Sequence, residues 1–534
     1  MATVSRACAR IVRVTTRRKD DMKVIEDRGL LFKVRDPNRI TTAIPASRQI
    51  GEHEVLVKWG VDEARVLRNL NLKDVPSPIM GRYNWPGKYR PFDHQKKTAA
   101  FLTMNRKGFC FNEQGTGKTA SAIWAADFLM KEKQIRRALV ICPLSIMDSA
   151  WRADLFTFAM HRSVDIAHGS REKRRAVING GAEFVVINYD GIEIVQDDIK
   201  RAGFDLIIVD EATHYKNPQS KRWKALYEIV EHDTWLWMMT GTPAAQSPLD
   251  AFGLAKMVRS KEIPRFFSAW REMVMMRVTN FKWVPKPSAI KSVHDALQPA
   301  IRYTKAQCLD LPEMTYVKRK IELTAQQKKY YKSIRDLMVT TAAGEQVTAV
   351  NAAIVMNKLL QISSGAVYAD SGETVEFDIK NRYKVLCEVI EESSQKVLVF
   401  VPFKHTIQQL SEKLTKDGIT NGIIAGDVSV TKRTELFSQF QNTSDPRVLI
   451  IQPQAAAHGV TLTAANTVVW WGPVASLETY AQANARVHRQ GQRHPCTVVQ
   501  LEGSPVEYRI YRMLDERIDV HSKIVDLYNE ILET

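Results

Sequence analysis

Cysteine is scarce in this sequence, and its few residues are scattered. There are six in 534 residues, and no two of them form a C-x-x-C pair. The sequence therefore indicates neither a zinc site nor a framework of disulfides, and it favours a reducing compartment. Three of the cysteines lie in apolar segments typical of buried strands, namely Cys110, Cys142 and Cys496.

Long apolar runs, internal repeats and low-complexity tracts are also missing. The longest apolar runs are far shorter than the ~20 residues that a membrane-spanning helix needs, so we expect no transmembrane segment. Acidic residues are absent from the first nineteen positions, which hold six basic ones. That composition is typical of a mitochondrial presequence. However, the stretch RIVRVTTRR alternates apolar and polar residues as a strand does, and we expect a strand there.

Acidic residues are outnumbered by basic ones over the whole chain. Lys and Arg number 76 against 59 Asp and Glu, which gives a net charge of +17 and an isoelectric point near 9.5. A basic excess of this size is typical of proteins that bind nucleic acid or another polyanion. A basic surface without such a partner is the alternative that charge alone leaves open.

The first part of the chain predicts a small domain. Residues 1–88 hold three short alternating segments, IVRVTT, GLLFKV and EVLVKW, which are typical of strands in a small β-containing domain. A stretch rich in Pro and Gly, 75–91, has the composition of a linker.

Beyond the linker, short apolar segments alternate with helical patterns in two series. The first series is GFCF, ALVICP, FVVINYD, LIIVDE and WLWMMTGTP, and the second is KVLVFVP, GIIAG, VLIIQP, TVVWWGP and CTVVQL. Such segments predict parallel sheets covered by helices on both faces. Two series predict two α/β lobes rather than one large doubly wound sheet. We place the lobes at 89–300 and 301–534, with helical insertions at their junction over 244–395 and an amphipathic helix at the C-terminal end.

A phosphate-binding loop is predicted directly after the first strand of the first series. The segment FNEQGTGKTAS carries the pattern G-x-G-K-T, whose glycines let backbone N–H groups face a triphosphate at the N-terminus of a helix. Lys118 would neutralise the β- and γ-phosphates, and Thr119 would bind Mg²⁺. The strict pattern begins with a further glycine, and Asn112 stands in its place. The predicted nucleotide-binding residues of the loop are Gly115, Thr116, Gly117, Lys118, Thr119 and Ala120.

Two acids at the end of the strand segment FDLIIVDE predict the partner of this loop. A carboxylate pair at the end of a buried strand is costly unless a cation lies there. Mg²⁺ bound by Thr119 and the phosphates would be that cation. Asp210 would contact it, and Glu211 would orient and polarise the attacking water. The alternative is a strand end with two solvated acids.

A series of longer motifs runs in order along residues 89–500. In the first half they are YRPFDHQKKTAAFL, NEQGTGKT, ALVICPLSIMDSAWRADLFTF, DEATHYKN and MMTGTPAAQSPLDAF. In the second half they are AAAHGVTLTAANTVVWW and YAQANARVHRQGQ. Together they resemble the motifs of the Swi/Snf family of superfamily 2 helicase-like ATPases. The chain is similar to the compact bacterial and bacteriophage members of that family.

The resemblance implies a fold of two RecA-like lobes and assigns roles to further residues. Gln95 in the first motif would read adenine, and Gln482 would join the cofactor-binding residues. Arg486 and Arg489 would act across the cleft as arginine fingers on the transferring phosphoryl group. Their spacing of three residues predicts one face of a helix, and a solvated basic helix is the alternative.

The sequence departs from the family pattern at two places. Thr213 replaces the His of the acidic motif, and His214 follows it. Hydrolysis should survive this change, because the metal and base roles fall on Asp210 and Glu211. In the second half, Val460 and Thr461 replace the usual Gly and Asn, which puts details of DNA coupling in doubt.

These observations predict a DNA-dependent ATPase that uses ATP and Mg²⁺ to move along double-stranded DNA. A strand-separating helicase, or a nucleic-acid-binding scaffold with a weak ATP site, is the alternative. We expect a monomeric motor without a membrane segment, in the cytoplasm of a prokaryotic or phage-infected cell, associated with the nucleoid. The sequence does not separate repair, recombination, remodelling and phage replication as its pathway.

Overall fold

The computed structural model describes residues 22–25, 29–72, 74–241, 243, 247–279, 283–308, 311–342, 349–368, 374–456, 460–489 and 491–516. Two predicted segments, the first strand (IVRVTT) and the last part of the C-terminal amphipathic helix, lie outside these residues. Within the described part, no helix is both long and apolar enough to cross a membrane.

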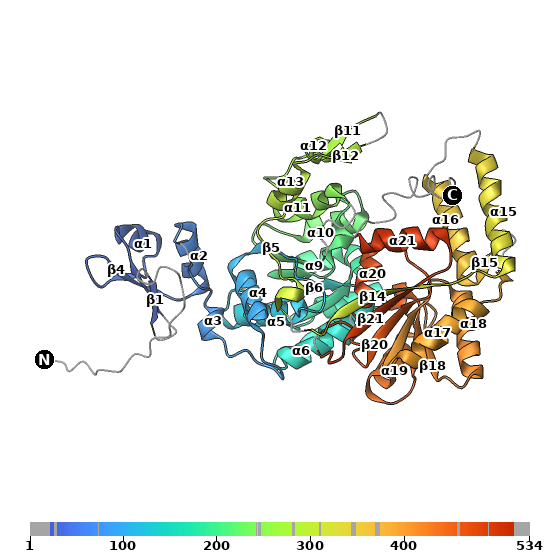
Figure 1. Cartoon of the computed structure of the whole chain (residues 1–534). Helices are drawn as coiled ribbons and strands as arrows, with labels where there is room; N and C mark the ends of the chain where they lie inside the picture. Colours follow the sequence, from blue (N-terminus) through green and yellow to red (C-terminus); the bar gives the residue numbers. More distant parts are fainter. Residues whose placement is uncertain are drawn as a thin grey trace.

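A small N-terminal unit is built on an antiparallel sheet of order β1-β2-β4-β3. Its elements are β1 (Met22–Ile25), β2 (Gly29–Lys33), α1 (Asn38–Ala43), β3 (Arg48–Gln49), β4 (Glu54–Lys58) and α2 (Val61–Asn69). Apolar residues alternate along β2 and β4, so that Leu30, Phe32, Val55 and Val57 share one buried face. The predicted segments GLLFKV and EVLVKW thus form strands, and Figure 1 shows this unit in blue beside the first lobe.

The first lobe contains a seven-stranded parallel sheet of order β13-β5-β10-β9-β6-β8-β7. Its strands are β5 (Lys107–Cys110), β6 (Ala138–Cys142), β7 (Val164–Ala167), β8 (Phe184–Asn188), β9 (Leu206–Val209), β10 (Trp235–Met239) and β13 (Ala300–Ile301). The helices of the lobe are α3 (Ile79–Arg82), α4 (Asp93–Met104), α5 (Lys118–Lys131), α6 (Ala153–Phe158), α7 (Arg171–Ile178), α8 (Tyr189–Ile194), α9 (Gln196–Ala202), α10 (Lys221–Ile229) and α11 (Ala251–Val258). Two apolar clusters pack on its two faces, as expected for continuous apolar strands.

The second lobe contains a six-stranded parallel sheet of order β14-β21-β20-β17-β19-β18. Its strands are β14 (Met314–Lys320), β17 (Lys396–Phe400), β18 (Asn421–Ile424), β19 (Val448–Ile451), β20 (Ala465–Trp470) and β21 (Cys496–Glu502). Its main helices are α17 (Lys380–Glu392), α18 (Lys404–Lys416), α19 (Val430–Asn442), α20 (Leu477–Asn484) and α21 (Pro505–Asp515). Two apolar clusters again cover the two faces. The predicted fold class, two α/β lobes with parallel sheets, is confirmed.

The region between the two series of strands is more varied than the predicted helical insertions. It holds α12 (Phe267–Val274), β11 (Met275–Arg277), β12 (Trp283–Pro285), α13 (Ala289–Ala296), α14 (Lys305–Cys308), α15 (Ala325–Ala342), α16 (Ala349–Ser364), β15 (Ala366–Tyr368) and β16 (Thr374–Glu376). Figure 1 shows the group from α12 to α13 projecting from the first lobe, whereas α15 and α16 lie at the outer side of the second. The helices are confirmed, and two short hairpins accompany them.

The strand order brings the predicted functional segments to one edge of the first sheet. β5 and β9 both pair with β10, and all of these strands are parallel. Their carboxyl ends therefore meet at one edge, where ligands bind in open α/β sheets. Figure 1 shows the second lobe next to the first.

Candidate active site

The phosphate-binding loop connects β5 to α5, as the sequence predicts. Gly115 and Gly117 have φ angles of +83° and +81°, a left-handed conformation that favours glycine. Lys118 is the first residue of α5, and its Nζ donates a hydrogen bond of 3.0 Å to the carbonyl of Asn112. The loop therefore folds around the buried ammonium group that would meet the phosphates.

The side chain of Asn112 explains why this loop departs from the strict glycine pattern. Its Nδ2 donates to Oγ1 of Thr98 at 2.8 Å, and its Oδ1 accepts from the backbone N–H of Tyr303 at 2.9 Å. The amide thus ties α4 and the segment after β13 to the loop. A glycine at this position would lose both hydrogen bonds.

Gln95 lies on α4 against the same loop. Its Oε1 accepts from the backbone N–H of Phe92 at 3.0 Å, and its Nε2 donates to the carbonyl of Thr116 at 3.3 Å. A side chain at Gly117 would collide with the Gln95 amide, so packing also requires a glycine there. Gln95 is therefore held at the edge of the loop, where the resemblance places the adenine contact.

Asp210 directly follows β9, and its carboxylate is buried and well held. Its Oδ2 accepts a hydrogen bond from Nε1 of Trp151 at 3.0 Å, and its Oδ1 accepts one from the backbone N–H of Glu211 at 3.0 Å. Burial raises the pKa of Asp210, and the charge of Lys118 opposes that shift. The environment thus favours a cation at this carboxylate.

Glu211 lines the cleft with a backbone φ of +46°, which is uncommon for a residue other than glycine. Burial raises the pKa of its carboxyl to about 7, against the opposing charge of Lys118. Its Oε2 atom is buried and has no hydrogen-bond partner in the described part of the chain. An acceptor without a protein partner is available to a water molecule.

Arg486 and Arg489 come from the second lobe, but not from a helix face. The prediction of a shared helix face was wrong, because α20 ends at Asn484 and both arginines lie in the turns that follow. Their Nη1 atoms donate to the carbonyl of Val460 at 3.5 and 3.2 Å, which holds the two side chains together. Burial lowers the pKa of Arg486 to about 10, with Arg489 adding to the shift and Glu211 opposing it.

A cleft of about 520 Å³ between the lobes collects most of the predicted residues. It is lined by Gln95, Gly115, Gly117, Lys118, Thr119, Ala120, Asp210, Glu211, Arg486 and Arg489. Its lining also includes four aromatic residues, Tyr89, Phe92, Trp124 and Phe158. The arrangement offers a cationic loop, two carboxylates, two arginines and several aromatic side chains in one space.

Two predicted nucleotide contacts, Thr116 and Gln482, do not line the cleft. The Thr116 hydroxyl donates to the carbonyl of Glu113 at 2.7 Å and so braces the loop from within. Nε2 of Gln482 donates to Oε1 of Glu478 at 3.1 Å, and the same oxygen accepts from Oγ1 of Thr213 at 3.3 Å. Thr213, which replaces the His of the acidic motif, therefore contacts the other lobe.

The other departure, at Val460 and Thr461, also falls at the cleft. The Val460 carbonyl accepts from both arginines, and Thr461 is in the lining. The backbone carbonyl at position 460 therefore makes the contact with the arginines, so this contact does not depend on which side chain stands there.

Three residues near the cleft were not predicted. Trp151 stands inside the motif ALVICPLSIMDSAWRADLFTF without an assigned role, and its hydrogen bond to Asp210 gives that motif a physical role. Asp154 lines the cleft three residues later. Burial raises the pKa of Asp154 to about 6, against the charge of Arg489. Lys305 contacts both lobes, and no sequence pattern indicated it.

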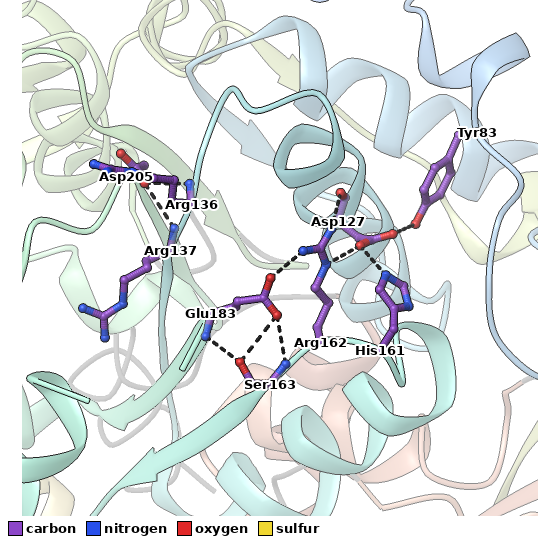
Figure 2. A network of polar contacts seen from close by, with 9 residues as sticks. All are labelled: Tyr83, Asp127, Arg136, Arg137, His161, Arg162, Ser163, Glu183 and Asp205. Atoms are coloured by element: carbon purple, nitrogen blue, oxygen red, sulfur yellow. Dashed lines mark hydrogen bonds and ion pairs between the residues drawn. The ribbon is translucent and has the colours of Figure 1, made fainter. Parts of the chain in front are cut away.

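The helix that begins at Lys118 is fixed at its buried Asp127 (Figure 2). Oδ2 of Asp127 accepts from the Tyr83 hydroxyl at 2.5 Å, and Oδ1 accepts from Nε2 of His161 at 2.8 Å and Nε of Arg162 at 2.6 Å. Arg162 also donates to Oε1 of Glu183 at 2.5 Å. The network joins α5 to the segments before α4 and after α6, and thus fixes the helix that presents the phosphate loop.

The side chains at the cleft fit a nucleotide with Mg²⁺. Magnesium is usually bound by one or two protein oxygens together with phosphate oxygens, and Thr119 and Asp210 supply a hydroxyl and a carboxylate there. The raised pKa of Asp210 and the unpartnered Oε2 of Glu211 both favour an added cation and its water. The glycine loop has the open backbone that phosphate oxygens require.

Comparison with known families gives two matches that together cover most of the chain. A family described as SNF2-related domain matches residues 54–366, and one described as helicase conserved C-terminal domain matches residues 381–491.

The chain is similar to relatives from bacteria, phage and vertebrates. An uncharacterized ATP-dependent helicase of Mycoplasma genitalium is 24% identical over 78% of this chain and 40% of its own length. Protein p41 of Acyrthosiphon pisum secondary endosymbiont phage 1 is 25% identical over 70% of this chain and 83% of its own length. The SWI/SNF-related matrix-associated actin-dependent regulator of chromatin subfamily A-like protein 1 of Xenopus laevis is 25% identical over 85% of this chain and 45% of its own length. The chain thus spans less than half of the length of several curated relatives.

Among solved structures, the chain is similar to the Sulfolobus solfataricus SWI2/SNF2 ATPase core in complex with dsDNA. The identity is 22%, the coverage is 84% of this chain and 97% of that one, and the TM-score is 0.41.

Proposed function

Because this chain belongs to the family of SNF2-related, helicase-like ATPases, we propose that it hydrolyses ATP and uses the energy to move along double-stranded DNA. One observation carries the proposal. A single cleft contains the phosphate loop and carboxylates of one lobe together with the two arginines of the other.

Each group at the cleft has a defined part in hydrolysis. The backbone N–H groups of the loop and Lys118 would bind the phosphates, and Thr119 and Asp210 would hold Mg²⁺, which would supply charge neutralisation when bound. Glu211 orients the attacking water through its unpartnered Oε2. Arg486 and Arg489 stabilise charge that develops on the transferring phosphoryl group.

Movement follows from the division of these groups between two lobes. Because the arginines come from the second lobe, the complete site exists only when the lobes are together, and ATP would favour that state. Hydrolysis would then release the lobes. If each lobe contacts the DNA backbone, repeated closing and opening advances the protein along the duplex. The net charge of +17 suits contacts with phosphates.

We also propose the setting in which this motor works. The units are an N-terminal domain over 1–88 and lobes over 89–300 and 301–534, acting as a monomer. The DNA is that of a prokaryotic or phage-infected cell, in its cytoplasm and nucleoid, and the relatives from a mycoplasma and a phage support this. Repair or recombination would be consistent uses of a duplex motor.

Hydrolysis rates with different nucleic acids test the proposal. We expect ATP turnover to rise with duplex DNA and to rise much less with single-stranded DNA or RNA. Lys118→Ala should abolish turnover under all conditions, since it removes the cation that neutralises the phosphates. A protein stimulated by single strands but not by duplex would contradict a duplex motor.

A displacement assay tests movement itself. A third strand annealed in the major groove should be released when ATP is present, while a forked duplex stays paired. DNA affinity should depend weakly on sequence and fall steeply with salt, since the contacts go to phosphates. Efficient unwinding of the fork would show a strand-separating helicase instead.

A further inference from the structure

The segment that joins the two lobes runs beside the phosphate loop. The backbone N–H of Phe111 donates to the carbonyl of Ile301 at 2.8 Å, and that of Glu113 donates to the carbonyl of Tyr303 at 2.9 Å. In return, the backbone N–H of Tyr303 donates to Oδ1 of Asn112 at 2.9 Å. Hydrogen bonds therefore align the start of the joining segment, residues 301–303, with the loop that would hold the phosphates.

Lys305 lies at the end of this segment and contacts both lobes. Its backbone N–H donates to Oε2 of Glu113 in the phosphate loop at 3.0 Å. Its Nζ donates to the backbone carbonyl of His488 in the second lobe at 3.0 Å. His488 directly precedes Arg489, and its ring Nε2 is held by the carbonyl of Pro312 at 2.9 Å. One residue thus connects the phosphate loop to the turn that carries the arginine.

Packing at Gly115 shows how closely these groups fit. A Cβ atom at this glycine would lie 3.2 Å from Cβ of Arg489 and 3.7 Å from Cε of Lys305. The stems of both cationic side chains therefore pack against the same loop residue.

The surroundings of Lys305 are unfavourable for a charged lysine. Burial lowers its pKa to about 8, Glu113 opposes the shift, and Arg489 and Arg486 add to it. A buried cation beside two arginines costs free energy, which the charge of Glu113 and the hydrogen bond to His488 offset. Lys305 lines a separate cavity with Glu113 and His488, not the cleft itself. A direct contact with the nucleotide is therefore not its role in this structure.

We propose that Lys305 is a positioning residue for Arg489. Lys305 holds the His488 carbonyl close to the phosphate loop, and it thereby places Arg489 beside the position that the transferring phosphoryl group would occupy. The proposal rests on the proposed function, because it concerns the arginine finger of an ATPase. It assigns to the joining segment a part in assembling the site as well as in linking the lobes.

Substitution of Lys305 gives the first test. Lys305→Met keeps the stem but removes the hydrogen bond to His488, and we expect kcat to fall about 10²-fold, as for a catalytic group displaced by about 1 Å. KM for ATP should stay within about threefold of the wild type. Lys305→Arg retains a donor and should recover most of the rate. Lys224→Met, an exposed lysine on α10, is the matched control and should leave the rate unchanged.

A double-mutant cycle separates positioning of Arg489 from an independent role. In an Arg489→Ala background, Lys305→Met should cost little more, because the arginine that it positions is absent. An equal cost in both backgrounds, a rise in KM with unchanged kcat, or no recovery with Lys305→Arg would each overturn the proposal.

Binding measurements give a readout independent of turnover. Both Lys305→Met and Arg489→Ala should weaken binding of ADP with aluminium fluoride, which mimics the transferring phosphoryl group, and leave binding of a non-hydrolysable ATP analogue nearly unchanged. Unchanged binding of the mimic would overturn the positioning role. A wild-type protein that hydrolyses no ATP would instead contradict the proposed function, whereas an active wild type with a fully active Lys305→Met would contradict this inference alone.

Discussion

At the scale of the residue, Glu211 combines a left-handed backbone with a carboxylate oxygen that has no partner in the described structure. Glu211→Gln keeps the shape of the side chain but removes its ability to accept a proton. We expect turnover to fall about 10²–10⁴-fold, with ATP affinity within a few-fold of the wild type. Single-turnover hydrolysis and binding of a fluorescent ATP analogue measure the two effects separately. Near-normal turnover of the variant would show that another residue orients the attacking water.

Asp154 gives a prediction about pH and stability. Burial raises the pKa of its carboxyl to about 6, so the folded state binds its proton more tightly than the unfolded chain does. The wild type therefore loses stability from this group as the pH rises through 6, whereas Asn at this position stays neutral. The free energy of unfolding of Asp154→Asn, relative to that of the wild type, should therefore rise by about 1–2 kcal/mol from pH 5 to pH 8. Thermal unfolding at both pH values checks this, and a variant that is less stable at pH 8 would show that attraction to Arg489 outweighs burial.

Sequence patterns predicted the residues of local motifs better than those that depend on distant contacts. Lys118 and Asp210 stand in short motifs whose chemistry is readable, and both line the cleft. The role of Lys305 depends on a carbonyl 183 residues away. Nothing local marks such a contact, because it exists only after the two lobes have folded against each other.

At the scale of the element, the apolar strand segments were predictable, whereas the partly exposed strands β7 and β14 were not. All ten predicted segments of the two lobes form strands, since burial on both faces requires an unbroken apolar run. β7 is partly exposed, and β14 is a lysine-rich edge strand whose residues are nowhere fully buried. Its basic residues Lys318 and Arg319 pair with Asp515 and Glu392 at 3.1 and 2.6 Å, so these two side chains are engaged within the protein.

The hydrogen bonds of Asp127 on α5 predict that the stability of the first lobe depends strongly on this one carboxylate. Asp127→Ala removes the buried acceptor shared by Tyr83, His161 and Arg162, and it leaves Arg162 with the carboxylate of Glu183 alone. Breaking one side of a buried ion pair costs about 3–5 kcal/mol, so the unfolding temperature should fall clearly in calorimetry. Asp165→Ala, at an exposed carboxylate on β7, should change it little. If both substitutions lowered the unfolding temperature equally, the Asp127 network would stabilise the lobe no more than an exposed carboxylate does.

At the scale of the whole molecule, the fold divides the reacting groups between two lobes that are separate in sequence. The loop and acids lie on the first sheet, and the arginines lie beyond α20 of the second. Composition and periodicity predicted both lobes, but only the resemblance assigned the arginines to the opposite side of the cleft. Their placement in turns instead of a helix could not be predicted from the spacing, because a three-residue interval fits both.

This division leads to a prediction for Arg489, whose only described hydrogen bond from Nη1 goes to a backbone carbonyl of its own lobe. Arginine fingers act on charge in the transition state and are worth about 10³–10⁵ in rate. Arg489→Ala should therefore lose DNA-stimulated hydrolysis while ATP affinity changes only a few-fold, because the groups predicted to bind the ground-state phosphates all lie in the first lobe. Turnover with saturating duplex DNA, compared with equilibrium binding of ATP, measures the two quantities. If the variant lost binding and hydrolysis equally, Arg489 would be a ground-state ligand, and the first lobe alone would not account for nucleotide affinity. If hydrolysis fell but duplex stimulation of the remaining rate persisted, DNA would act through the first lobe without requiring the second to close.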